Sequence, residues 1–226
     1  MNPENRFSMF TLNGREVPHK VTLQKQKRVG DGSEVKTDRT DLIYGDSKKI
    51  KGMVAKKYFT AYKTREELRE HLKEVLSQWS YIRNAMVERK KVGKITFKTP
   101  KTIRGYEEKD KEIGILMTDL TQGGKNTVID LKDYVEEPSF DLQTWEKIKS
   151  QLLRDVEVAR EERIVLTDLS LLALDPWLVV YENHEPVLYF VDVGEHTRVN
   201  QPEAKVDKAI EHVLSYIQRI DKKFTV

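Results

Sequence analysis

Residues 64–91 form one long amphipathic run in a half of the chain that otherwise predicts strands. Thr64 and Glu67 open the run with the spacing of a capping box, and its apolar residues recur every three or four positions. We therefore predict a long helix over this range, bent or broken near Ser80. Because this helix stands among strands, the sequence predicts a mixed α and β fold.

β-prone runs lie on both sides of this helix, at residues 19–24, 42–44, 51–62, 94–106 and 112–120. Gly30 and Gly32 stand two apart between the first two runs, which predicts a tight loop joining two strands. Residues 1–27 are otherwise polar and irregular, and they predict an N-terminal extension.

The second half of the chain is mainly helical, with helical patterns at residues 130–135, 141–162 and 203–221. Two short strands between the last two helices predict a hairpin at residues 177–192. The change from strands to helices falls near residues 120–124. We therefore predict an α+β protein with two lobes, a β-rich N-lobe over residues 28–120 and a minimal, mainly helical C-lobe over residues 121–226.

The composition excludes several classes of protein. Of the 226 residues, 38% are apolar, which is enough for a core, and 40 basic residues nearly cancel 37 acidic ones. The absence of cysteine excludes disulfides and thiolate zinc sites, and the five histidines show no ligand spacing. The basic cluster at residues 88–94 is expected to solvate a helix end rather than to contact RNA.

No apolar stretch of the sequence is long enough to cross a membrane. The first ten residues also lack the basic and then apolar order of a signal peptide. We therefore expect a cytoplasmic protein without a membrane partner.

Two acids follow short apolar strands near the predicted hairpin. Asp168 comes after the apolar residues 164–166 and Asp192 after residues 187–191, and a hairpin between them would return the chain to the same edge. Carboxylates placed in this way can bind a divalent cation, and one of them can accept a proton from a hydroxyl. The alternative is that both acids cap loops, which is the commoner role of an isolated aspartate after a strand.

The loop around residue 31 and the strand that follows the next turn could hold an anion. Gly30 and Gly32 let backbone amides approach a phosphate, and Ser33 adds a hydroxyl. Lys57 shares a strand face with Ala55, from which it could reach over a phosphate. Simpler interpretations exist, because Gly-x-Gly pairs usually form hairpin turns and strand lysines are usually solvated.

The order of these features resembles the layout of the protein kinases over almost the whole chain. "GDG" at residues 30–32 is similar to the start of the glycine-rich loop, and "VAKK" at residues 54–57 to the lysine strand. "TDLS" at residues 167–170 resembles the catalytic loop, and "DVG" at residues 192–194 resembles the metal motif. Within the kinases, the chain is similar to the atypical RIO family, which also has Asp-Leu-Ser, Asp-Val and a segment like residues 200–219.

The resemblance implies an ATP-dependent kinase or ATPase that uses magnesium. For ATP binding it implies Gly30, Gly32, Ser33, Ala55, Lys57, Glu88, Met117 and Leu120, for catalysis Asp168 with Lys57, and for magnesium Asp192 and Asp175. Met117 would be the gatekeeper, and the backbone of Leu120 would meet the adenine base.

The sequence departs from the kinase pattern at several positions. Leu166 replaces the catalytic-loop histidine, and Ala173 stands where an asparagine would bind the metal. Asp175 substitutes for that asparagine if the loop is two residues longer, since carboxylate oxygen is a good magnesium ligand. The helix glutamate that should pair with the lysine is either Glu88 or Glu74.

Two other functions remain open at the level of the sequence. A pseudokinase would act as a nucleotide-binding or protein-interaction scaffold, and the Ala173 and Asp175 positions separate it from an enzyme. A metal nuclease would use the Glu-x-Lys pattern of residues 34–36, but no aspartate at the end of a strand precedes that pattern. No motif identifies a phosphoacceptor or a protein partner.

Overall fold

The computed structural model describes residues 7–11, 21–31, 35–44, 48–58, 64–101, 103–108, 112–122, 125–166, 174, 176–191, 193 and 198–225. The chain divides into two compact units. Unit 1 contains Met1–Ser80 and Pro100–Gly123, and unit 2 contains Tyr81–Thr99 and Gly124–Val226. The mixed α and β fold class is confirmed, with two antiparallel sheets and four α-helices among the described residues.

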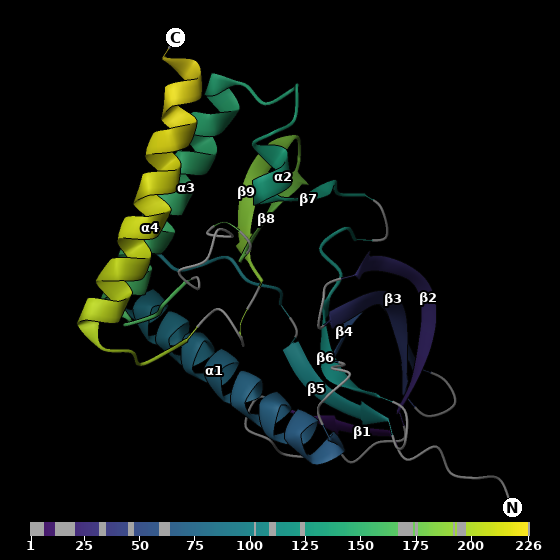
Figure 1. Cartoon of the computed structure of the whole chain (residues 1–226). Helices are drawn as coiled ribbons and strands as arrows, with labels where there is room; N and C mark the ends of the chain where they lie inside the picture. The colour runs from purple at the N-terminus through teal and green to yellow at the C-terminus, as the bar shows by residue number, and fades with distance from the viewer. Residues whose placement is uncertain are drawn as a thin grey trace, which may run out of the picture. The chain divides into compact units, whose positions relative to one another are not determined.

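Unit 1 is built on a six-stranded antiparallel sheet in the order β1-β5-β6-β4-β3-β2 (Figure 1). Its strands are β1 (Phe7–Phe10), β2 (Val21–Asp31), β3 (Val35–Tyr44), β4 (Lys48–Tyr58), β5 (Ile103–Glu108) and β6 (Glu112–Thr118). All seven residues of β6 except the last are buried, because β6 has neighbours on both sides and covered faces.

The helix α1 (Arg65–Lys91) is continuous over 27 residues, so the predicted long helix is confirmed and the alternative of a break near Ser80 is wrong, while the alternative of a bend stays a prediction. Its start confirms the capping box: the Thr64 N–H donates to Glu67 Oε2 at 2.5 Å, and the Glu67 N–H donates to Thr64 Oγ1 at 3.3 Å. It ends in a Schellman motif, in which Gly93 has a φ of +72° and the Lys94 N–H reaches the Arg89 carbonyl at 2.9 Å.

The first turns of α1 pack against β5 on one face of the unit 1 sheet. A Cβ at Gly105 of β5 would lie 2.7 Å from Leu76 Cδ1, so the helix approaches the strand where a side chain is missing. Two residues further along β5, Glu107 forms ion pairs with Arg65 at 2.8 Å and Arg69 at 2.6 Å. Gly105 and Glu107 therefore mark the α1 face of the sheet.

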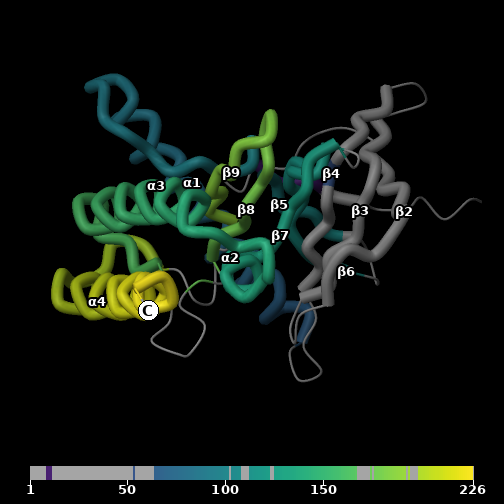
Figure 2. The backbone as a smooth tube through the Cα atoms, turned by 90° about the horizontal axis from the view of Figure 1, so that it is seen from above, coloured from purple at the N-terminus to yellow at the C-terminus, as the bar shows by residue number. Residues whose placement is uncertain are grey.

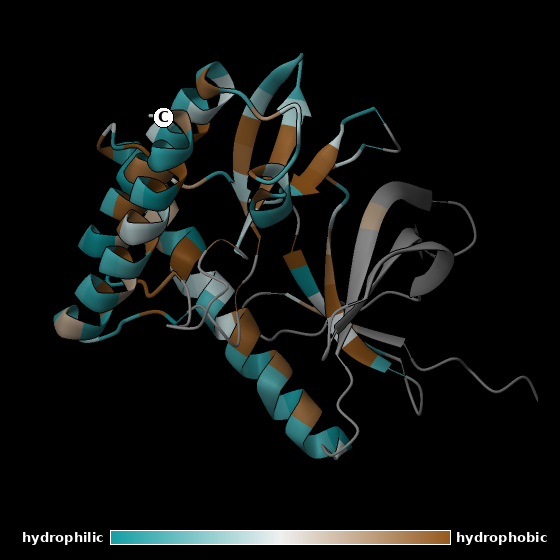
Figure 3. Cartoon of the chain, turned by 45° about the horizontal axis from the view of Figure 1, so that its top comes forward, coloured by the Kyte–Doolittle hydropathy of each residue, from teal (hydrophilic) through white to brown (hydrophobic). Residues whose placement is uncertain are grey.

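Unit 2 combines a three-stranded antiparallel sheet, in the order β7-β8-β9, with helices. Its elements are β7 (Val128–Asp130), α2 (Leu131–Tyr134), α3 (Leu142–Glu161), β8 (Trp177–Glu182), β9 (Glu185–Phe190), α4 (Glu203–Asp221) and the 3-10 helix η1 (Lys222–Phe224). α3 and α4 run side by side (Figures 1 and 2), and both carry apolar as well as polar residues along their length (Figure 3). Their buried residues include Trp145, Ile148, Leu152, Val156, Val206, Ile210, Val213 and Ile217.

Three parts of the secondary structure differ from the sequence-based prediction. β1 and β7 are strands that the sequence did not indicate, and the predicted strand over residues 94–106 begins only at Ile103. Pro100 interrupts that run, since proline cannot donate to a ladder. Before it, Lys98 bonds to β9 instead, because its carbonyl accepts the Phe190 N–H at 2.8 Å.

Among the described residues, no helix is both long and apolar enough to span a membrane.

Candidate functional site

β4 carries the predicted phosphate lysine and lies between β3 and β6. Lys57 pairs with Gly114 of β6, whereas its neighbour Lys56 pairs with Ile115, which in turn pairs with Gly105. Paired residues of an antiparallel sheet share a face, and successive residues alternate between faces. Lys56 therefore belongs to the α1 face and Lys57 to the opposite face.

Met117, the predicted gatekeeper, lies near the end of β6 and is buried. Its partner on β4 is Val54, which shares a face with Lys56. Ala55 lies on the other face, with Lys57. The register thus puts Met117 on one face of the sheet and Ala55 and Lys57 on the other, and it puts Lys56 on the face of Met117. The face of each lysine depends on pairing between β4, β6 and β5, which no local pattern encodes.

The chain turns sharply after β6, at the predicted hinge. Leu120 is partly buried there and stands between Asp119, which is 2% exposed, and Thr121. Asp119 Oδ1 accepts hydrogen bonds from the Thr121 N–H at 2.9 Å and from the Thr121 hydroxyl at 2.6 Å. The kinase resemblance points to Leu120 and not to Asp119. Asp119 nevertheless carries the same sequence signal as Asp168 and Asp192, an acid that follows an apolar strand.

Of the glycine loop, the structure describes Gly30 and Asp31. Gly30 lies in β2 opposite Thr37, directly after a register shift between Arg28 and Gly30. Such irregularities re-aim a strand near its end, and glycine favours them. Gly32 and Ser33 lie outside the described residues.

Both candidate partners of the lysine are exposed glutamates of α1. Glu88 is 69% exposed and forms an ion pair with Lys91 at 2.6 Å. Glu74 is also exposed, and Gln78 donates to it at 3.4 Å. At 3.6 residues per turn, these glutamates lie roughly 160–200° around the helix from Leu72, which contacts the sheet. The ion pair with Lys57 stays a prediction.

The three predicted aspartates, Asp168, Asp175 and Asp192, lie outside the described residues, as does Ala173. The chain neighbours of two of them bond to each other: the Val191 N–H donates to the Pro176 carbonyl at 2.9 Å. Pro176 directly follows Asp175 in the sequence, and Val191 directly precedes Asp192. The predicted hairpin is confirmed, and its open end holds these two neighbours together.

A buried acid supports this open end from α3. The Trp177 indole N–H donates to Asp155 Oδ2 at 2.8 Å, and Trp177 pairs with Phe190 across the hairpin. Their rings meet edge to face at 5.9 Å, and Phe97 stacks on Phe190 at 5.0 Å. Burial raises the pKa of Asp155 to about 7, since its partner is a neutral donor.

Among the described residues, no group of three or more His, Asp and Glu side chains is placed to hold a metal ion. The predicted ligands Asp175 and Asp192 are not among them. Their chemistry fits magnesium, which prefers carboxylate oxygen, and the hairpin holds their chain neighbours together.

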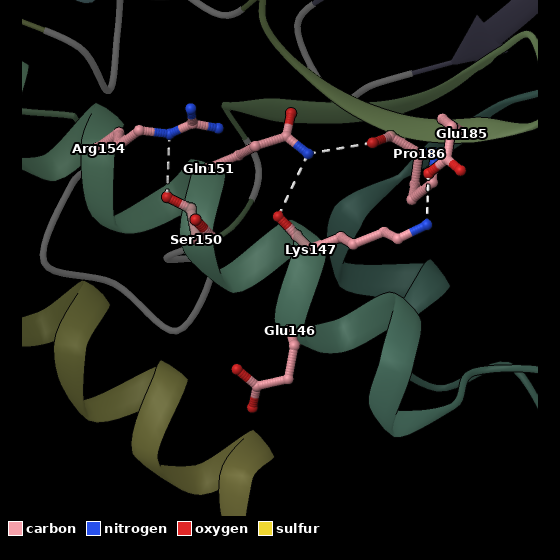
Figure 4. A pocket seen from close by; sticks show the side chains of 7 residues that line it. All are labelled: Glu146, Lys147, Ser150, Gln151, Arg154, Glu185 and Pro186. Atoms are coloured by element: carbon pink, nitrogen blue, oxygen red, sulfur yellow. Dashed lines mark hydrogen bonds and ion pairs between the residues drawn. The ribbon is translucent and has the colours of Figure 1, made fainter.

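A shallow groove of about 500 Å³ lies between α3 and the start of β9 (Figure 4). Gln151 of α3 reaches across it: its amide donates to the Pro186 carbonyl at 3.0 Å and accepts from the Leu188 N–H at 3.0 Å. Lys147 and Glu185 form an ion pair beside it at 2.5 Å. Gln151 thus occupies backbone groups of β9, which is an edge strand.

The chain matches none of the protein-family models or curated proteins with which it was compared.

Proposed function

We propose that the chain is a two-lobed, protein-kinase-like protein of the RIO-like kind that binds ATP with magnesium and transfers or hydrolyses the γ-phosphate. The order of strands in unit 1 carries the proposal. Gly30, Lys57 and Leu120 are far apart in the sequence, yet β2, β4 and β6, which carry or precede them, belong to one sheet. A nucleotide bound along this sheet would meet all three motifs.

Two neighbouring lysines are candidates for binding the phosphates. The resemblance assigns Lys57, whereas the register favours Lys56, because Lys56 shares a face with the proposed gatekeeper Met117. A gatekeeper and a phosphate lysine that contact one nucleotide have to lie on one face of the sheet. Lys56 and Lys57 are consequently a matched pair, with the same side chain at adjacent positions on opposite faces.

The hairpin of unit 2 supports the proposed metal site. The bond between Val191 and Pro176 brings together the chain on either side of β8 and β9, next to Asp175 and Asp192. Asp175 and Asp192 would hold the magnesium ion, which would supply positive charge to neutralise the phosphates. Asp168 would orient the attacking hydroxyl or water and accept its proton.

The second candidate function is a nucleotide-binding scaffold without catalysis. The exposure of both Glu74 and Glu88 favours it, since neither glutamate lies on the side of α1 that contacts the sheet. A phosphate lysine without its helix partner is less firmly oriented.

Calorimetric titration of the full chain with ATP, with magnesium and with EDTA, tests the proposal. We expect binding that strengthens with magnesium. The two variants are Lys56→Ala and Lys57→Ala. The one that removes the lysine in contact with the phosphates should weaken ATP binding about 10–100-fold, the value of a charge-assisted hydrogen bond. The other lysine variant is the control, which should bind as the wild type does. Absence of ATP binding, or equal affinity in both variants, contradicts the proposal.

Phosphate release separates the enzyme from the scaffold. Asp192→Ala should abolish the effect of magnesium on ATP binding, because a ligand is lost. Asp168→Ala should leave ATP binding nearly unchanged and lower turnover about 10²–10⁴-fold, the usual scale of acid–base assistance. Wild-type chain that binds ATP but releases no phosphate, with and without candidate acceptors, would support the scaffold.

A further inference from the structure

Asp119 shapes the turn that follows β6. Its Oδ1 accepts both the backbone N–H of Thr121, at 2.9 Å, and the hydroxyl of Thr121, at 2.6 Å. Its own carbonyl accepts the Gln122 N–H at 3.1 Å, and Gln122 has a φ of +48°. Side chain and backbone of one aspartate therefore close two overlapping turns.

The Asp119 side chain is buried. Asp119 is 2% exposed, and its Oδ1 accepts two hydrogen bonds from Thr121, two residues further along the chain. Two bonds to one residue restrict both the Asp119 side chain and the backbone between the two residues, so the turn has a defined path.

Leu120 is the residue at the apex of this turn. The pairing of β6 with β4 ends one residue earlier than Asp119, at the pair of Thr118 with Met53. From there on, the bonds between Asp119 on one side and Thr121 on the other restrict the path of the chain at Leu120. Leu120 is also the residue whose backbone would contact the adenine base.

We propose that Asp119 is a positioning residue that holds the Leu120 backbone in place for recognition of the nucleotide base. This inference rests on the proposed function, because it concerns the base end of the same ATP site. Asp119 is expected to affect the binding of the base and not the binding of the phosphates. The phosphates would be bound by groups elsewhere on the sheet and in the hairpin.

The test compares ATP with inorganic tripolyphosphate, which has the phosphates but no base. Calorimetric titrations of both ligands with magnesium are made for the full chain and its variants. Asp119→Ala should weaken ATP binding about 10-fold, as expected for one misplaced hydrogen bond, and should change tripolyphosphate binding less than about twofold. Asp119→Asn keeps an acceptor oxygen for Thr121 and should retain most of the ATP affinity.

Asp141 provides a matched control in unit 2. Its Oδ1 also accepts the backbone N–H of a threonine, Thr144, at 2.7 Å, but it caps α3. Asp141→Ala should leave the affinities of both ligands unchanged. If Asp119→Ala does not fold, Thr121→Val carries the test, since it removes only the hydroxyl donor and should weaken ATP in the same direction.

The outcomes separate the inference from the proposed function. Equal losses for ATP and tripolyphosphate, or unchanged ATP affinity in a folded Asp119→Ala chain, overturn the positioning role while ATP binding itself stands. Wild-type chain that binds neither ligand overturns both.

Discussion

Asp155 is a carboxylate that the fold buries against a neutral partner. It is 7% exposed, and the group that faces it at 2.8 Å is the Trp177 indole N–H. Burial raises its pKa to about 7, although the nearby Arg154 and the bond from Trp177 offset part of the effect. The ionised form is therefore penalised in the folded chain but not in the unfolded one.

This difference makes stability depend on pH. Between an unfolded pKa near 3.9 and the folded value of about 7, the folded chain binds more protons, so its stability falls as pH rises through that window. We expect Asp155→Asn, which keeps an acceptor for Trp177, to remove this fall. Its advantage over the wild type should grow between pH 5 and pH 8, by no more than about 3 kcal/mol.

Urea denaturation at the two pH values measures this difference. Other titrating groups are present in both chains, so the comparison of Asp155→Asn with the wild type cancels their contributions. An advantage that is the same at pH 5 and pH 8 would contradict the raised pKa of Asp155.

Elements with local signals were predictable from the sequence, and those that depend on distant pairing were not. The capping box at Thr64, the apolar period of α1 and α3 and the two runs of the hairpin gave the correct elements. β1 and β7 have only four and three residues, and they are strands because β5 and β8 pair with them.

The candidate site also depends on pairing between distant strands, which the sequence alone does not predict. The motif at residues 54–57 predicts a strand, and these residues lie in the strand β4. The choice between Lys56 and Lys57 needs the register of β4 on β6 and of β6 on β5, because a shift of one residue exchanges the faces. The sequence distance to the following strand favours Glu88 as the partner of the lysine. The structure shows that both Glu74 and Glu88 are exposed and lie away from the side of α1 that contacts β5.

The packing of α1 on β5 depends on the absence of a side chain at Gly105. A Cβ there would lie 2.7 Å from Leu76 Cδ1 and 3.4 Å from the Leu72 methyl groups. Gly105→Val should destabilise the chain by about 1–3 kcal/mol, because the cost of overpacking exceeds the gain in β-propensity. Gly105→Ala should cost less, since the end of the Leu76 side chain can move. Thermal and urea unfolding measure both changes.

A Leu76→Ala background identifies the cause. The contact at 2.7 Å involves Cδ1, which this substitution removes, so Gly105→Val should cost less there than in the wild type. Additive effects of the two substitutions would mean that the loss arises from the strand itself and not from its contact with α1.

At the scale of the whole molecule, each unit carries a different part of the proposed chemistry. Unit 1 contains the glycine loop, the lysines and Leu120, and unit 2 contains the three aspartates. The C-terminal part of α1 is tied into unit 2 through Arg89, which bonds Glu161 at 2.8 Å and the Ile95 carbonyl at 2.8 Å. The N-terminal part of the continuous helix α1 thus belongs to unit 1 and its C-terminal part to unit 2.

The amide of Gln151 has a consequence for how separate copies of the chain meet. It occupies the Pro186 carbonyl and the Leu188 N–H, two groups through which a strand from another copy could add to β9. Gln151→Leu removes these bonds, and we expect it to cause concentration-dependent dimers and larger species, measured by light scattering after size-exclusion chromatography. Gln143→Leu, on the exposed side of the same helix, should not; equal behaviour of the two variants would contradict the role. Self-association through this stretch of β9 would then be limited by one side chain.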